Sequence, residues 1–399
     1  AIVSLMGAVS ADRLRADVAT LFGFGTRHVL SSPEGGRRGI GAARSWLGAA
    51  FTQAGRGAAS QLVVGDEPFP LTFGGRSTEQ RNVVATLTGI GDAKRFVYVV
   101  AHYDARAAAA EDGAGDAPGA SDNASGTAAL LELARVLGRR QWDATIRLVA
   151  TTAGEAGQLG ARYHAAHARA LGAPIVAVFD NDGIGGAAGP GGSPQPAAVR
   201  AVAAGGDDGA SLRLARHAAV IAARYAEHLR APAGPLAVEP VGEAAGPDRE
   251  GDDAAFTEAS FAALRLADAV EDGAARHGPA DTADRLDPAY HAAVVRLNVA
   301  LAANLALAPA AVPGPPRLVA DASPPGRYQV LWDAVPDAAV AGYVVAWRRA
   351  GEARYAGTVW SATTAAVLDG LPTDGDLRVA VAASDDLGHL GPFGAEARR

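Results

Sequence analysis

Side chains that can bind metal ions or transfer protons follow three apolar runs of the sequence, at the point where each run ends. They are His102 and Asp104 after FVYVVA, Glu155 after TIRLVATTAG, and Asp180 and Asp182 after PIVAVF. Continuous apolar runs are typical of buried parallel strands, and ligands bind beyond the carboxyl ends of such strands in open α/β sheets. We therefore expect these side chains to meet at one edge of a sheet.

Two further residues extend this candidate site. Asp122 lies in GASDNASGTAALLELARVL, where Ser121 or Asp122 could instead cap the helix that the following apolar residues predict. His277 lies in a loop rich in Gly, Pro and Asp. Imidazole and carboxylate groups in a chain without cysteine suit a pair of zinc ions that activates water for hydrolysis. The remaining histidines of predicted helices are expected at the surface: His164, His167 and His291.

The segments between these residues alternate between strand-like and helix-like patterns. Helices are predicted at 9–22, with Ser10 or Asp12 as the cap, and at 39–55. Strands are predicted in SQLVVGDE, RNVVATLTGI and RFVYVVAHY, of which the last should be central. Further on, 199–231 has a helical pattern, PLAVEPVG and SFAALRLAD have strand patterns, and PAYHAAVVRLNVALAANLALA predicts a closing helix. This alternation predicts an α/β fold with a mostly parallel mixed sheet flanked by helices.

The chain is expected to contain two domains. The α/β domain covers 1–308, and the proline-rich segment PAAVPGPP at 309–316 is a predicted linker. Residues 317–399 consist of short alternating runs, which are typical of a small β-sandwich. Trp332 and Tyr343 are expected in the core of that sandwich.

Charge and hydropathy exclude several classes of partner. The net charge of −7 and the absence of a basic cluster argue against a nucleic-acid partner. No apolar run approaches the roughly 20 residues that cross a bilayer, and the first residues do not have the pattern of a secretory signal. We expect either a cytoplasmic protein or a mature secreted form, and the sequence does not indicate an oligomeric state.

Five motifs carry a resemblance to a known family. AHYDAR, DAPGASDNASGTAALLELARVL, GEAGQLGARYHA, NDGIG and HGPADTADRLDPAY occur in the order and spacing of the co-catalytic dizinc aminopeptidases. That family includes bacterial leucyl aminopeptidases and glutamate carboxypeptidase II, and the resemblance covers roughly residues 80–305. It implies a zinc exopeptidase-like fold, two Zn²⁺ ions, peptide substrates and the release of N-terminal amino acids.

The resemblance also implies a role for each site residue. Asn181-Asp182 matches the family's Asn-Asp pair, which selects Asp182 over Asp180. The implied ligands are His102 and Asp182 for one zinc, Glu155 and His277 for the other, and Asp122 as the bridge. Asp104 resembles the carboxylate that orients the first histidine by accepting its other N–H.

The sequence departs from the family at one position. The family has two consecutive glutamates after the second strand, the first a general base and the second a ligand, whereas this chain has Gly154 and Glu155. An alignment with a one-residue gap would instead make Glu155 the base and remove a ligand. Asp252 and Asp253 are candidates for a replacement base. The alternative function is a catalytically impaired, metal-binding or receptor-like relative.

The C-terminal residues resemble a fibronectin type III module. The resemblance rests on PPRLVA, VLWDAV, VAGYVVAWRR, LDGL and VAVAASDDLGHLGPF. Such modules are mostly extracellular, and the peptidase family is often secreted. Together these resemblances imply a secreted or periplasmic protein whose signal peptide has been removed.

Overall fold

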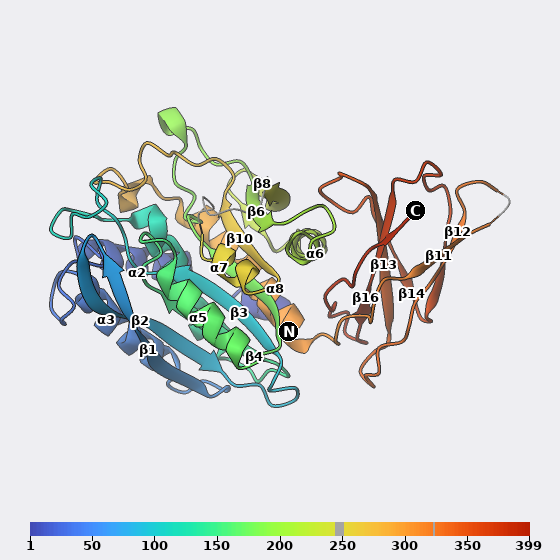
Figure 1. Cartoon of the computed structure of the whole chain (residues 1–399), viewed down its shortest axis with the longest axis horizontal. Helices are drawn as coiled ribbons and strands as arrows, with labels where there is room; N and C mark the ends of the chain where they lie inside the picture. The colour runs from blue at the N-terminus through green and yellow to red at the C-terminus, as the bar shows by residue number, and fades with distance from the viewer. Residues whose placement is uncertain (244–250, 322–323) are drawn as a thin grey trace.

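A mixed sheet of eight strands forms the centre of the N-terminal part of the computed structural model, which describes residues 1–243, 251–321 and 324–399 (Figure 1). The strand order is β1-β2-β4-β3-β5-β10-β6-β9. The strands are β1 (Leu62–Phe73), β2 (Arg76–Leu87), β3 (Phe96–His102), β4 (Thr145–Thr151), β5 (Ile175–Asn181), β6 (Ala198–Ala204), β9 (Ala237–Glu243) and β10 (Ala263–Asp268). A separate pair of short strands consists of β7 (Arg230–Ala231) and β8 (Gly234–Pro235).

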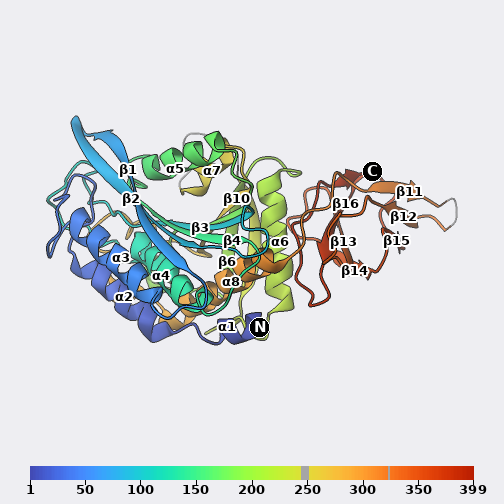
Figure 2. The ribbon, with the colours of Figure 1, turned by 90° about the horizontal axis from the view of Figure 1, so that it is seen from below.

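Helices cover both faces of this sheet. The helices are α1 (Ile2–Met6), α2 (Ala11–Gly23), α3 (Ile40–Ala54), α4 (Gly126–Leu137), α5 (Leu159–Ala170), α6 (Ala210–Arg224), α7 (Asp253–Glu258) and α8 (Pro288–Leu307). The short helical turns are η1 (Ala120–Ser125), η2 (Pro190–Gly192) and η3 (Ala283–Arg285). Figure 2 shows α5 and α7 on one side of the sheet and α2, α3, α4 and α8 on the other. The predicted α/β class, with a large mixed sheet between helices, is therefore confirmed.

The central strand is the one that the sequence predicts. Six of the seven residues of β3 are buried, because strands and helices cover it on every side. It pairs in parallel with β4, where His102 lies opposite Thr151, and with β5, where Val100 lies opposite Asp180. The carboxyl ends of these three strands therefore meet at one edge of the sheet, as expected.

Two local predictions are wrong. The segment 199–231, predicted to be largely helical, contains α6 but begins with a strand, because β6 pairs with β10 and β9. Neither Ser121 nor Asp122 caps α4, whose first flanking residue is Ser125 and which has no side-chain cap. Asp122 has non-helical backbone angles within η1, so its carboxylate is left for another role. Ser10, in contrast, caps α2 by accepting a hydrogen bond from the backbone N–H of Arg13.

Helix α8 occupies the segment predicted as the closing helix, and much of it is apolar. An 18-residue stretch of this 20-residue helix has a mean hydropathy of 1.3, so by length and composition alone the helix could cross a membrane. In the structure 89% of this segment is buried, and α8 contacts α1, α2, α4 and β3. It therefore packs as the central helix of one face of the sheet.

The C-terminal residues form two antiparallel sheets. Their strands are β11 (Arg317–Ala320), β12 (Tyr328–Leu331), β13 (Gly342–Arg349), β14 (Gly357–Ser361), β15 (Ala365–Leu368), β16 (Leu377–Ser384) and β17 (Ala397–Arg398). Trp332 and Tyr343 are buried against each other, with ring centroids 5.4 Å apart, so their predicted place in this core is confirmed. The fibronectin type III resemblance stays a prediction.

The C-terminal sheets dock firmly onto the α/β part. Val344 and Ala382 belong to the same hydrophobic cluster as the central sheet. Arg348 is buried and donates hydrogen bonds to Glu396 at 2.6 Å and to Asp207 at 2.8 Å. Such a buried charged network fixes the relative position of the two parts, because a buried charge has lost its hydration and is compensated only while its partner is in place.

Candidate metal centre

Five side chains from separate parts of the chain meet at the carboxyl edge of the central strands. His102 ends β3, Asp182 directly follows β5, and Glu155 follows β4 after a short turn. Asp122 comes from η1, and His277 comes from the loop between β10 and α8. The structure thus brings together the five residues that the resemblance implies as ligands.

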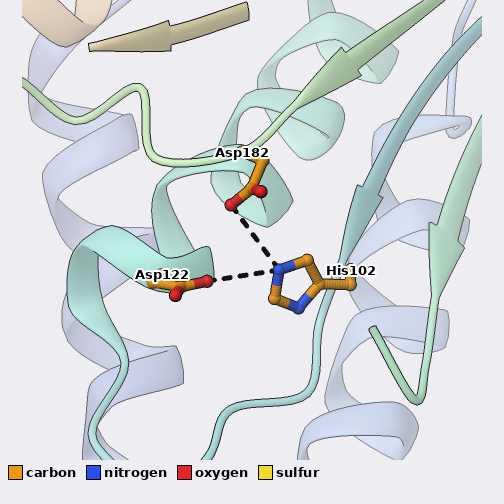
Figure 3. Close-up of side chains that lie close together, drawn as sticks. All are labelled: His102, Asp122 and Asp182. Carbon is orange, nitrogen blue, oxygen red and sulfur yellow. Dashed lines mark ion pairs between the residues drawn. The ribbon is translucent and has the colours of Figure 1, made fainter. Parts of the chain in front are cut away.

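These side chains form two groups that share Asp122. In the first, the Nε2 of His102 lies 3.2 Å from Asp122 Oδ1 and 3.6 Å from Asp182 Oδ1 (Figure 3). In the second, the Nε2 of His277 lies 3.0 Å from Asp122 Oδ2 and 3.3 Å from Glu155 Oε2. Within each group the ligand atoms all lie within 4.8 Å of one another. Each group offers one imidazole nitrogen and two carboxylate oxygens, a donor set that suits zinc.

Three buried oxygens of this cluster lack hydrogen bonds. Asp122 Oδ1, Asp182 Oδ1 and Glu155 Oε1 are buried and accept no hydrogen bond from the described residues. A buried carboxylate oxygen without a partner is unfavourable, and a bound cation removes that penalty. The residues present therefore fit divalent metal ions, which the two groups would hold with Asp122 as their common member.

Asp104 and Asp281 support the candidate ligands through contacts with His102 and with backbone N–H groups. The carboxylate of Asp104 accepts the backbone N–H groups of Gly154 at 2.9 Å and Glu155 at 3.1 Å, and lies 3.4 Å from Nδ1 of His102. The backbone carbonyl of Asp104 is also 3.2 Å from that nitrogen. The carboxylate of Asp281 accepts the N–H groups of Ser121 at 2.7 Å and Asp122 at 2.9 Å. The Asp122-Asn123 peptide bond is cis.

Arg27 connects the loops around the centre through hydrogen bonds to their backbone carbonyls. It is fully buried and donates hydrogen bonds to the carbonyls of Tyr103, Leu21, Pro118 and Gly119. The sequence analysis missed Arg27 and Asp281, because their partners are backbone groups distant in the sequence. The position of Asp281, four residues after His277 in the same loop, was the available signal for one of them.

Arg276 is a third residue that the sequence analysis missed. Its Nε lies 3.0 Å from Asp122 Oδ2, and its Nη2 lies 3.5 Å from Asp182 Oδ1. A further contact of 3.0 Å joins its Nη1 to Glu271. The guanidinium thereby supplies positive charge to the carboxylates of both ligand groups.

The charges of the cluster shift its proton affinities in opposite directions. Burial alone would lower the pKa of His102, but the contacts of the ring with Asp104, Asp122 and Asp182 reverse that effect. Burial alone would raise the pKa of Asp122, but the charge of Arg276 and the contacts with His102 and His277 reverse it. The pKa of His102 is therefore raised well above its usual value and that of Asp122 is well below its own. Burial and the charge of Asp122 hold the pKa of Glu155 well above its usual range. The histidine contacts and Arg276 lower the pKa of Asp182 to about 2, against its burial.

Gly154 leaves no space for a side chain. A Cβ atom at this position would lie 2.5 Å from Cγ and 2.7 Å from Cβ of His102, closer than carbon atoms approach without displacement. The imidazole therefore lies directly against the main chain of Gly154. Glu155, one residue later, reaches His277, which is the arrangement that the ungapped alignment predicts.

Asp252 brings another carboxylate to the same cavity. The cavity has a volume of about 130 Å³, and Asp252 lines it together with His102 and Glu155. The side chain is 1% exposed; it accepts a hydrogen bond from Thr151, while its Oδ1 accepts none. Burial raises the pKa of Asp252 to about 7, despite the opposing charge of His102. Asp253 does not line this cavity, and its N–H donates to Asp180.

The predicted surface position is wrong for two of the three other histidines. His164 is buried and its Nδ1 lies 2.8 Å from Glu67, and His291 is buried with its Nε2 3.0 Å from the carbonyl of Ser125. His167 is exposed, as predicted. Each buried ring makes one structural hydrogen bond, and neither ring lines the cavity at the metal centre.

Comparisons with known proteins agree with this geometry. Peptidase family M28 matches residues 82–302. A probable zinc metalloprotease of Pyricularia oryzae is 34% identical over 384 residues, which cover 86% of this chain and 74% of that protein. A second probable zinc metalloprotease, from Pyrenophora teres f. teres, is 29% identical and covers 86% of this chain and 76% of the relative.

Solved structures share the fold at low identity. The LapA aminopeptidase of Legionella pneumophila matches with a TM-score of 0.59 and 18% identity, over 76% of this chain and 74% of that chain. The glutaminyl cyclase of Porphyromonas gingivalis matches with a TM-score of 0.55 and 18% identity, over 74% and 98% of the two chains. Because the two names describe different reactions, the fold alone does not select one. The family match and the relatives establish that this chain belongs to peptidase family M28, as a metal-dependent peptidase.

Proposed function

We propose that this protein is a dizinc aminopeptidase that releases N-terminal amino acids from peptides. The observation that carries the proposal is the position of Asp122, whose two oxygens belong to two different groups of metal-binding side chains. A carboxylate in this position can bridge two ions, and two ions can bind both the attacking water and the scissile carbonyl. In this proposal His102 and Asp182 hold one zinc, and Glu155 and His277 hold the other.

The protein's own residues position the reacting groups. Zinc ions at this centre would lower the pKa of a bound water to about 7 and polarise the scissile carbonyl. Asp104 orients His102 and fixes the turn that carries Glu155, through its contacts to Nδ1 and to the two backbone N–H groups. Asp281 holds the backbone N–H of Asp122 in the same way.

Asp252 is our candidate for the general base. Gly154 carries no side chain at the position where the family has its base, whereas Asp252 presents an unpaired, buried Oδ1 to the same cavity. In this role Asp252 accepts a proton from water at Oδ1 and returns it to the leaving amine nitrogen. A base with a pKa near the working pH suits both transfers.

The alternative function is a relative that binds metal without efficient catalysis. Gly154 favours this alternative, because a positioned general base contributes about 10²- to 10⁴-fold to the rate. The alternative predicts the same metal content as the aminopeptidase proposal, and therefore only hydrolysis separates the two.

Metal content and hydrolysis together test the proposal. We expect two zinc ions per chain by elemental analysis, and cleavage of at least one substrate in a panel of aminoacyl p-nitroanilides and dipeptides, with loss of activity in chelator. His277→Ala should lose zinc and at least about 100-fold of the activity, since a ligand is removed. His167→Ala removes an exposed histidine and should leave both unchanged. Two zinc ions without hydrolysis would favour the impaired relative, and no bound zinc would contradict both functions.

A further inference from the structure

No apolar side chain of the described residues lines the cavity at the metal centre. Of the twelve residues that line it, three are glycines and nine carry polar or charged side chains. Within the described part of the chain, an aliphatic substrate side chain entering this cavity therefore meets no apolar side chain. Burying an apolar group against charged groups gains little of the hydrophobic free energy on which leucine pockets depend. Selection at this centre must rest on polar recognition.

Arg106 is the lining residue whose charge is not used by the protein. It lies in the loop after β3, four residues beyond His102, and its side chain is partly exposed. Its Nε is buried without a hydrogen-bond partner, and no ion pair joins it to another residue in the described ranges. Arg276, the other arginine of the cavity, is held by Asp122 and Glu271. Arg106 is therefore the guanidinium that is free to bind a substrate group.

The chemistry of that group follows from charge and geometry. A guanidinium presents a planar set of N–H donors that matches a carboxylate with two parallel hydrogen bonds. Two bound dications would more than neutralise the three ligand carboxylates Asp122, Glu155 and Asp182, so those carboxylates would not neutralise Arg106. An anionic group on the substrate would then find its counter-charge within the cavity.

We propose that Arg106 binds a carboxylate of the peptide substrate and makes the centre selective for peptides that carry one beside the scissile bond. This inference rests on the proposed peptidase function and specifies its substrate class. The carboxylate has two sources that share this chemistry: the α-carboxylate of a dipeptide and the side chain of an N-terminal Asp or Glu residue.

Binding of uncleavable ligands tests the inference without relying on turnover. The ligands are the reduced dipeptide Ala-ψ[CH2NH]-Ala, its C-terminal amide, and the amides of Glu-ψ[CH2NH]-Ala and Gln-ψ[CH2NH]-Ala, each titrated calorimetrically into the zinc-loaded protein. At least one acid should bind about 10- to 100-fold more tightly than its matched amide, the range expected for a charge-assisted hydrogen-bonded pair. The pair that responds identifies the source of the carboxylate.

Variants at two arginines separate recognition from general charge effects. Arg106→Gln should bring acid and amide affinities within about threefold of each other while zinc content stays unchanged, and Arg106→Lys should restore part of the difference. Arg139→Gln removes an exposed charge just beyond the carboxyl end of α4. It should change neither the difference between acid and amide affinities nor the zinc content. Equal affinity for acid and amide in both pairs, or no binding of either acid, would overturn the inference.

Hydrolysis of the corresponding substrates distinguishes the two proposals. The same comparison is made for kcat/KM with Ala-Ala, Ala-Ala amide, and the p-nitroanilides of Glu and Gln. Hydrolysis without any preference for the acids would refute the role of Arg106 and leave the peptidase function standing. Carboxylate-dependent binding without hydrolysis would refute the peptidase function and leave the role of Arg106 standing.

Discussion

Restoring the family's glutamate at position 154 should damage the metal centre and not repair it. In sequence terms Gly154→Glu adds the missing general base and should raise the rate. In the structure the new Cβ would lie 2.5 Å from Cγ of His102, whereas ordinary contacts begin at 3.4 Å. The imidazole must therefore retreat by about 0.9 Å, or the main chain must move away from the two hydrogen bonds that it shares with Asp104.

The size of this effect follows from the geometry of metal binding. Ligand distances in metal sites are satisfied only within about 0.2 Å, so a shift of this size removes His102 as a ligand. Loss of supporting contacts alone typically costs about 10- to 100-fold in metal affinity, and displacement of a ligand should cost at least as much. Overpacking of the buried ring should also lower the free energy of unfolding by about 1–3 kcal/mol.

Zinc competition with a chromogenic chelator measures this affinity, and a p-nitroanilide assay follows the rate. Gly154→Ala introduces the same Cβ without a carboxylate, so both variants should lose zinc to a similar extent. Gly48→Glu adds the same charge in α3, where nothing lies within 4 Å of the new Cβ, and should retain full zinc binding. If Gly154→Glu keeps two tightly bound zinc ions and gains about 10²-fold or more in rate, the steric argument is refuted.

Two further substitutions test the residues that support catalysis. Asp252→Asn keeps an oxygen that can accept from Thr151 but cannot take up a proton, so kcat should fall about 10²- to 10⁴-fold at unchanged zinc content. Because only ionised Asp252 accepts a proton, the rate of the unsubstituted protein should rise with pH through the pKa of this carboxyl group. That pKa is about 7 without metal and should be lower beside bound zinc. An unchanged rate in Asp252→Asn would exclude Asp252 as the base. Asp281→Ala leaves two buried N–H groups unpaired, so urea unfolding should report a loss of about 2–5 kcal/mol together with weaker zinc binding. The control is Asp284→Ala, which removes an exposed carboxylate three residues later. Equal stability of Asp281→Ala and Asp284→Ala would contradict the supporting role of Asp281.

The sequence predicts the framework of the centre well, because the framework depends on long apolar runs. The residues of β3 are apolar up to His102, and such a run is buried wherever a parallel sheet is covered on both faces. Once β3, β4 and β5 are parallel, their carboxyl ends must coincide. This is why residues from 102 to 182 could be predicted to meet without any knowledge of their contacts.

The wrong predictions share a different cause, since they concern positions where distant contacts override local preference. The segment AVRAVAA is rich in alanine, the residue with the highest helix propensity, yet it forms β6 because β10 and β9 pair with it. His164 lies on a helix, where an imidazole is usually solvated, but its partner Glu67 lies 97 residues earlier in the chain. No local pattern records such a partner.

Gly154 and Asp252 illustrate what an alignment can and cannot establish about a catalytic position. The alignment detects that a carboxylate is missing at 154, but it carries no information on whether the space for that carboxylate still exists. The structure indicates that the space is occupied by the ring of His102, and that a second carboxylate reaches the same cavity from the residue before α7. A missing catalytic residue therefore argues for lost activity only after the neighbouring volume and the other carboxylates of the cavity have been examined.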